Sequence, residues 1–254
     1  MAVANRLSKA APQQKKNAIA VFQANGMEVK LTPTIVKNYL VSGDKERVTD
    51  QEVAMFINLC KYSGLNPWLK EAYCIKYGNE PATMVTGKDA FMKRAEAIPA
   101  FDGLKAGIVA QNNETGDVEY REGMITLPGE TIIGGWAEVF RKDRSHSTRA
   151  EVSFEEYAAR KKDGTLNNQW SKKPATMIRK VALVQALREA FPTNLGGMYA
   201  AEEVGREEPD EAGMPQAPVN PETGEVMEAE VVEKKPEPKK EPEAPQTYSV
   251  EDLI

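Results

Sequence analysis

The sequence predicts an α+β fold, in which a small antiparallel β-sheet or hairpin core is flanked by helices and followed by a disordered acidic tail. Amphipathic segments with helix caps stand on both sides of a stretch of short apolar runs and turns. Short turns between such runs are typical of hairpins. Residues 201–254 hold half of the 16 prolines, lack periodicity and cannot bury enough apolar surface to fold.

The N-terminal region, residues 1–43, is expected to be helical. A first short helix is predicted at 13–23 and a second at 32–41. Pro33 suits the first turn of the second helix, where its missing N–H removes no hydrogen bond. The folded core is expected to occupy residues 44–200, and the tail residues 201–254.

A capping box, Thr49-Asp-Gln-Glu52, opens the next predicted helix. Gly64 suits the C-cap of this helix, and Pro67 prevents its continuation. Two apolar runs separated by Gly-Asn-Glu-Pro then predict a hairpin, and an amphipathic helix follows it. These three elements lie at residues 73–77, 82–86 and 88–97.

Four strands are predicted next, at residues 104–110, 118–121, 132–141 and 148–152. Ser153-Phe-Glu-Glu156 is a second capping box and is expected to start a helix that reaches about Lys161. A loop then leads to Trp170. The strongest helix runs from Pro174 to about Phe191, because its apolar residues recur at spacings of three and four.

Composition points to a soluble, cytoplasmic protein. Only two cysteines occur, Cys60 and Cys74, each in an apolar segment, which indicates reduced and buried thiols. The N-terminus lacks a continuous apolar signal core, and no apolar run approaches the ~20 residues that span a bilayer.

The charge of the chain is divided between its two parts. Residues 1–200 hold 28 Lys and Arg against 22 Asp and Glu, whereas residues 201–254 hold 5 against 16. A basic body with an acidic tail is a common arrangement in proteins that handle polyanions.

Catalytic motifs are weak in this sequence. The single histidine, His146, lies in a predicted turn where nothing suggests a Ser-His-Asp or Cys-His arrangement, and the clustered Cys and His that zinc sites need are absent. Thr86-Gly-Lys88 lacks the other residues of a phosphate loop. Carboxylates such as Glu71, Asp89 and Asp143 leave a metal-dependent nuclease open, but each lies beside a lysine or arginine and is better explained as a solvated ion pair. We therefore expect no catalytic residue, metal or cofactor.

Polyanion binding has more support, because basic residues cluster beside aromatic residues and turns. Lys172 and Arg179 are seven residues apart, as are Lys173 and Lys180, so the four share one side of the last helix. Such a stripe suits the phosphates of a single strand, and nearby rings suit its bases. Solvated helix faces and core tryptophans at Trp68 and Trp170 would give the same pattern. The other basic clusters are Trp68-Leu-Lys70, Phe140-Arg-Lys-Asp-Arg144, Arg160-Lys-Lys162 and Arg188.

Five segments together resemble the phage Bet/RecT family of single-strand annealing recombinases. They occur in the family's order and spacing over residues 44–201. The segments are Gly64-Leu-Asn-Pro-Trp-Leu-Lys-Glu-Ala-Tyr73, Val85-Thr-Gly-Lys-Asp-Ala90, Phe101-Asp-Gly103, Phe140-Arg-Lys-Asp-Arg-Ser-His146 and the stretch from Trp170 to Phe191.

The resemblance implies a non-enzymatic protein that coats single-stranded DNA and anneals it to a complementary strand without ATP, as a ring or helical filament. The N-terminal region would then contribute contacts between protomers. Expected partners are single-stranded DNA, the annealed duplex, a phage exonuclease and a host single-strand-binding protein, with no membrane. A non-annealing nucleic-acid-binding protein, including one that prefers RNA, is the main alternative.

The resemblance also carries over DNA-contacting positions where this sequence matches the family. Together with the basic clusters, the predicted DNA-binding residues are Lys45, Lys70, Arg141, Lys142, Arg144, Lys161, Lys172, Lys173, Arg179, Lys180 and Arg188. Lys162 is an equivalent choice to Lys161, because the loop there varies in length. Ala175 and Val181 stand where Bet members can carry lysines, and neighbouring lysines would replace those charges. The acidic tail would either compete with DNA for the basic groove or dock a partner protein.

Overall fold

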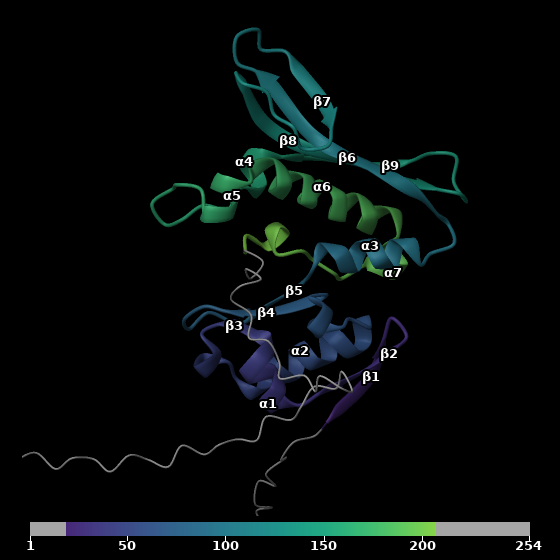
Figure 1. The fold of residues 1–254 in the computed structure, drawn as a ribbon, viewed down its shortest axis with the longest axis vertical. Helices are drawn as coiled ribbons and strands as arrows, with labels where there is room; N and C mark the ends of the chain where they lie inside the picture. The colour runs from purple at the N-terminus through teal and green to yellow at the C-terminus, as the bar shows by residue number, and fades with distance from the viewer. Residues whose placement is uncertain (1–18, 207–254) are drawn as a thin grey trace, which may run out of the picture. The chain divides into compact units, whose positions relative to one another are not determined.

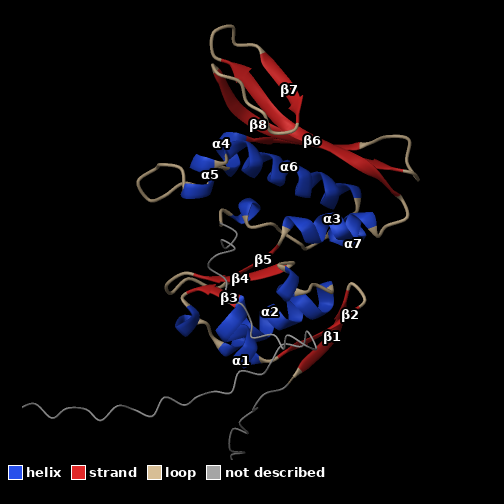
Figure 2. Ribbon diagram, in the orientation of Figure 1, coloured by secondary structure: helices blue, strands red, loops and turns tan. Residues whose placement is uncertain are grey.

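The computed structural model describes residues 19–206 of the 254-residue chain. The chain divides into two units, residues 1–216 and 217–254, and the described residues all belong to the first. Helices and small sheets alternate along it, which confirms the α+β class (Figure 2). Within 19–206 no helix is long and apolar enough to cross a membrane. Most of the predicted tail lies outside the described residues.

The described part begins with a hairpin rather than a helix. Strands β1 (Ala20–Ala24) and β2 (Met27–Leu31) pair antiparallel. The helix predicted at 13–23 is therefore wrong over residues 20–23, and residues 13–18 lie outside the described range. Asn25 and Gly26 explain the difference, because both adopt positive φ angles, 51° and 78°. An Asn-Gly pair with this geometry forms the turn that matches the twist of a two-stranded hairpin.

The helix predicted at 32–41 is confirmed in most of its length, in two parts. Helix α1 (Pro33–Ile35) is capped by Thr32, whose Oγ1 accepts a hydrogen bond from the Ile35 N–H at 3.1 Å. It continues as a π-helical turn, η1 (Val36–Leu40). The chain then enters strand β3 (Val41–Gly43), which pairs parallel to a later strand, and the 3₁₀ turn η2 (Lys45–Arg47).

The first capping box forms as predicted. Thr49 Oγ1 accepts from the Glu52 N–H at 3.2 Å, and the Glu52 carboxylate accepts from the Thr49 N–H at 2.8 Å. Helix α2 (Asp50–Ser63) starts there and ends at Gly64, which is left-handed as expected for a C-cap. The predicted hairpin and helix are also confirmed, as β4 (Ala72–Lys76), β5 (Thr83–Thr86) and α3 (Lys88–Glu96).

A four-stranded antiparallel sheet follows, with strand order β7-β6-β8-β9. All four predicted strands are present and each is longer than predicted, β6 most of all because it pairs with β8 over nearly its full length. The strands are β6 (Phe101–Asn112), β7 (Val118–Glu122), β8 (Glu130–Arg141) and β9 (Thr148–Ser153).

The second capping box does not form. Ser153 makes no side-chain cap, and the helix that it precedes is a single turn, α4 (Phe154–Tyr157), rather than one that reaches Lys161. The predicted loop before Trp170 contains the start of a short helix, α5 (Asn168–Lys172), capped by Asn167.

Helix α6 (Pro174–Ala190) confirms the strongest prediction and lies along one face of the four-stranded sheet (Figure 1). A glycine allows the close approach, since a Cβ atom on Gly135 would stand 2.6 Å from the carbonyl oxygen of Ile178. Ile178, Val181 and Val184 are fully buried in this layer. A short helix, α7 (Pro192–Leu195), follows directly.

The folded body extends beyond the predicted start of the tail. Ala201 and Glu202 are buried, and Glu202 begins the 3₁₀ turn η4 (Glu202–Val204). The described residues continue to Arg206. The Thr86 N–H donates to the Tyr199 carbonyl at 2.8 Å, which attaches this segment to β5. The boundary predicted at residue 201 is therefore too early, because two of the acidic residues counted with the tail pair with α6 instead.

Candidate nucleic-acid interface

The Gly64–Tyr73 motif forms a tight connection between α2 and β4. Asn66 accepts from the Trp68 N–H at 3.0 Å and so caps a 3₁₀ turn, η3 (Pro67–Leu69). Lys70 ends this turn with a φ of 59°, a left-handed conformation that is uncommon outside glycine. Backbone strain of this kind persists only where the surroundings enforce it, and it concentrates at functional positions.

A buried carboxylate holds the motif in place. Glu71 is 1% exposed and accepts hydrogen bonds from three separate elements. The donors are the Asn66 N–H at 2.8 Å, the Asn25 side chain at 2.9 and 3.1 Å, and Lys93 Nζ of α3 at 2.8 Å. The solvated ion pair predicted for Glu71 is therefore wrong, since the carboxylate is enclosed by its donors.

A second family motif packs directly against the first. The Gly87 N–H donates to the Glu71 carbonyl at 3.1 Å. A Cβ atom on Gly87 would collide with the backbone carbonyl oxygen of Lys70 and stand 3.3 Å from the Tyr73 ring. Glycine at position 87 thus allows two segments, 64–73 and 85–90, to meet around Lys70.

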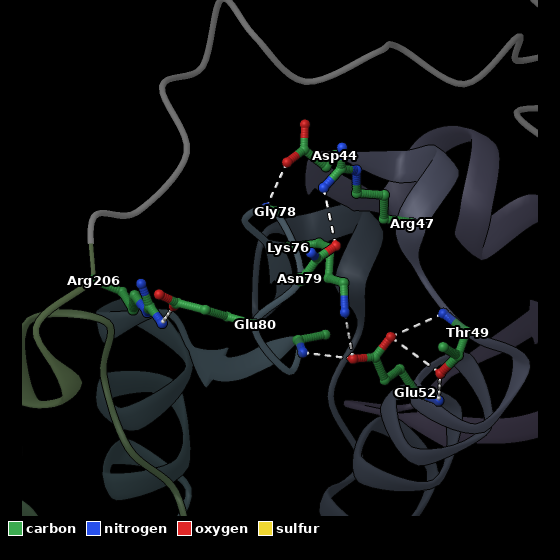
Figure 3. A network of polar contacts seen from close by, with 10 residues as sticks. Asp44, Arg47, Thr49, Glu52, Lys76, Gly78, Asn79, Glu80 and Arg206 are labelled. Carbon is green, nitrogen blue, oxygen red and sulfur yellow. Dashed lines mark hydrogen bonds and ion pairs between the residues drawn. The ribbon is translucent and has the colours of Figure 1, made fainter.

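The loop that carries Lys45 is attached to the turn between β4 and β5 (Figure 3). The Asp44 carboxylate accepts from the Gly78 N–H at 2.5 Å, and Arg47 donates to the Asn79 side chain at 3.0 Å. Lys45 itself is half-buried, and its Nζ donates to the Asn38 carbonyl at 3.0 Å.

The same turn also lies near a second basic segment. Arg206 donates to Glu80 at 2.6 Å, and this hydrogen bond is the main reason that the pKa of Glu80 is below its usual value. The positive charge of Lys162 lowers this pKa further, so the Lys161-Lys162 segment lies within electrostatic range of the turn. Lys161 is exposed.

Three predicted residues of α6 are half-buried and contact other parts of the body. Arg179 donates to the Ala106 carbonyl of β6 at 3.2 Å. Lys180 pairs with Glu202 at 3.0 Å. Arg188 pairs with Glu203 at 2.6 Å and lies over the Tyr199 ring, at 4.6 Å from its centroid. DNA phosphates would compete with these partners for the three cations.

The turn between β8 and β9 carries three further predicted residues in different environments. Arg141 pairs with Asp143 at 2.6 Å, donates to the Ala190 carbonyl at the end of α6, and lies over the Phe191 ring. Lys142 and Arg144 are exposed. Arg141 therefore fixes the turn, and the other two cations are presented to solvent.

The predicted residues do not form one compact cluster. Lys172 and Lys173 are exposed at the N-terminal end of α6, whereas Lys142, Arg144 and Arg188 lie toward its other end. A helical rise of about 1.5 Å per residue separates the two ends by roughly 24 Å. The phosphates of one B-form DNA strand advance about 3.4 Å each along the helix axis, so a strand with that rise would place roughly seven over this distance. The arrangement suits a strand that follows the helix.

The tryptophans in the basic clusters belong to the core. Trp170 is fully buried and packs edge-on against Phe154, with ring centroids 5.5 Å apart. Trp68 is half-buried and packs against the main core. Base stacking on Trp170 would require the core to open.

An aromatic cluster lies on the sheet face opposite α6 and was not predicted; its Tyr120 ring is exposed and its Trp136 ring is buried. Strand alternation places Trp136 opposite to Gly135, which faces the helix. Arg149 lies between the rings of Tyr120 and Trp136, at 5.1 and 4.9 Å from their centroids. The alternating pattern of β7 and β9 is the signal that could have identified this cluster.

The remaining candidate groups are paired or buried. Asp89 pairs with Lys88 at 3.2 Å, and no group of three His, Cys, Asp or Glu side chains that could hold a metal ion is present in the described range. Cys60 and Cys74 are buried free thiols, as predicted, and burial raises the pKa of each to about 12.

The fold and the motifs together define an α+β protein whose two most specific motifs meet around a strained lysine. The RecT family model matches residues 25–215, and the chain belongs to the RecT family. The chain is 26% identical over 160 residues to the recombination protein bet of Escherichia phage lambda, covering 61% of this chain and 52% of that protein. It is 30% identical over 145 residues to an uncharacterized protein of Ureaplasma parvum serovar 3, covering 57% and 56%. The chain thus spans about half the length of these relatives.

Proposed function

We propose that this protein binds single-stranded DNA and anneals complementary strands without ATP, as an oligomer in phage recombination. The observation that carries the proposal is the meeting of segments 64–73 and 85–90 around Lys70, inside the range that the RecT family model matches. The name of the lambda relative, a recombination protein, supports the same reading.

In this mechanism the protein holds the phosphates and leaves the base edges free to test a second strand. The exposed cations Lys142, Arg144, Lys161, Lys172 and Lys173, with Lys45 and Lys70, make the first phosphate contacts. DNA phosphates compete with internal partners for four further cations, Arg141, Arg179, Lys180 and Arg188. Sequence is then selected by base pairing, and the protein needs no base-specific side chain.

Binding to single-stranded DNA at increasing salt tests the phosphate contacts. Lys70→Ala and Lys142→Ala should each weaken binding to all sequences alike and reduce the salt slope by about 0.7 for each lost contact. Lys105→Ala is the matched control, because Lys105 is an exposed lysine of β6 outside the predicted set. Unchanged slopes in both test variants would contradict the assigned contacts.

Assembly on DNA should supply most of the affinity, because one protomer offers few phosphate contacts. We propose contacts between protomers through the N-terminal region, where the hairpin β1–β2 leaves Ile19, Val21 and Met27 exposed. Mass photometry of the protein on a long oligonucleotide measures this directly. Single protomers bound at independent positions would refute the assembly.

The acidic tail is proposed either to compete with DNA or to dock a partner such as an exonuclease or a host single-strand-binding protein. A chain ending at Arg206 separates the two roles, since it keeps the folded residues 201–206. Tighter DNA binding by this chain supports competition. Unchanged DNA binding with lost recombination in cells supports docking.

A non-annealing coat protein that binds single strands, or RNA, would use the same basic residues. Annealing kinetics distinguish it, because such a protein would bind DNA and leave the rate of strand pairing unchanged. Incubating labelled DNA with the protein and Mg²⁺ tests for a nuclease, because only a nuclease would cleave the DNA.

A further inference from the structure

A polar cavity of about 240 Å³ lies beside the π-helical turn η1. Its lining residues are Lys37, Asn38, Lys45, Glu46 and Val48. Apart from Lys45, none of them belongs to the predicted DNA-binding set. Turns with π-helical geometry occur frequently at functional sites, because the extra residue in the turn displaces side chains from regular helical positions.

Two lysines line this cavity, and the ammonium group of each has a partner within the protein. Lys45 Nζ donates to the Asn38 carbonyl at 3.0 Å, a neutral partner that does not cancel its charge. Lys37 Nζ pairs with Asp50 at 2.7 Å, and the Asp50 side chain is 92% exposed. A water-exposed ion pair of this kind contributes little net stability, so an incoming anion can replace Asp50 at small cost.

The lining selects the class of ligand. It contains two cations and one carboxylate, Glu46, which is too few acidic groups for a metal ion that takes oxygen ligands. It contains no aromatic ring on which a base could stack. An anionic group of small size is the chemistry that remains, and Lys side chains bind phosphate as point charges.

We propose that this cavity is a phosphodiester subsite for single-stranded DNA, in which Lys37 acts together with Lys45. The inference rests on the proposed function, since it extends the DNA path to a residue of η1. In the free protein the Asp50 carboxylate forms an ion pair with Lys37, and a backbone phosphate replaces this carboxylate when DNA binds.

Fluorescence anisotropy with labelled oligo(dT) over a series of NaCl concentrations tests the subsite. Lys37→Gln should weaken binding and lower the salt slope per bound protomer by about 0.7. Asp50→Asn should keep the slope and tighten binding about two- to fivefold, because Lys37 no longer has a competing carboxylate. Lys105→Gln is the matched control, because Lys105 is an exposed lysine of β6 that belongs neither to this cavity nor to the hairpin.

The outcomes separate this inference from the function on which it rests. Wild-type protein that fails to bind oligo(dT) overturns both. Normal wild-type binding with an unchanged slope in Lys37→Gln, or with an equal loss in Lys105→Gln, overturns the subsite alone. Unfolding curves that match wild type must accompany each variant, and Asp50→Asn provides a gain of binding that misfolding cannot imitate.

A second measurement identifies the source of the phosphate. Side-chain NMR signals of Lys37 and Lys45 should shift when oligo(dT) is added and stay unchanged with inorganic phosphate at the same phosphate concentration. Equal shifts with inorganic phosphate would assign the cavity to a free anion and overturn the DNA subsite.

Discussion

Replacing Glu71 by glutamine tests whether the buried carboxylate organises the motif loop. Glutamine has nearly the same shape and keeps one acceptor oxygen, but its amide presents N–H groups to donors from Asn66, Asn25 and Lys93. Hydrogen bonds to charged groups contribute about 1.5–3 kcal/mol each, and Lys93 is half-exposed, so water replaces part of its loss. We therefore expect a decrease of about 2–3 kcal/mol in the free energy of unfolding.

Thermal and urea unfolding measure this change. For a domain of this size, about 1 kcal/mol corresponds to a shift of roughly 2–4 °C, so the midpoint should fall by roughly 4–12 °C. Glu122→Gln is the control, because Glu122 is exposed on β7. Under stabilising conditions Glu71→Gln should also weaken DNA binding, since the left-handed Lys70 loses its neighbouring support. A change within about 0.5 kcal/mol of the control would refute the reasoning.

Three further predictions concern stability and reactivity. Thr49→Ala should cost about 1 kcal/mol in urea unfolding, whereas Ser153→Ala should cost less than half of that because Ser153 forms no cap; equal losses would contradict the capping assignment. The hydrogen bond from Lys76 is the main reason that the pKa of Glu52 falls from 4.5 to about 2. The ionised Glu52 carboxylate therefore stabilises the fold fully above about pH 4.5, and this stabilisation is lost as the pH falls toward 2. Glu52→Gln should flatten the pH dependence of unfolding over that window, and a parallel curve would exclude this role. Burial raises the pKa of Cys60 and Cys74 to about 12, so iodoacetamide at pH 8 should label them only after denaturation. Mass spectrometry measures the labelling, and rapid labelling of the native protein would disprove the burial of these thiols.

Local signals in the sequence predicted most elements correctly. The capping box at Thr49 works because Glu52 can reach back to the cap and remain in place through Lys76 and Ala82. The same pattern at Ser153 forms no side-chain cap, and the helix that follows is only one turn long. The hairpin β1–β2 was not predicted, although Asn25-Gly26 is a strong signal for a two-residue hairpin turn.

Long-range pairing is what the sequence could not supply. Helical spacing correctly groups Lys180 and Arg188 on α6, but it does not reveal that Glu202 and Glu203 return to cover them. The acidic residues were counted with the tail because their composition resembles it. Glu71 was interpreted as a solvated ion pair, because two of its donors lie far from it in the sequence. Asn25 is 46 residues away and Lys93 is 22 residues away.

Strand annealing without ATP or metal tests the central claim most directly. Two complementary labelled oligonucleotides would be mixed with and without the protein, under conditions that slow spontaneous pairing, at several salt concentrations. We predict faster pairing with the protein and a loss of this acceleration as salt increases, because the phosphate contacts are screened. Tight binding to single strands with no increase in the pairing rate would contradict the annealing function.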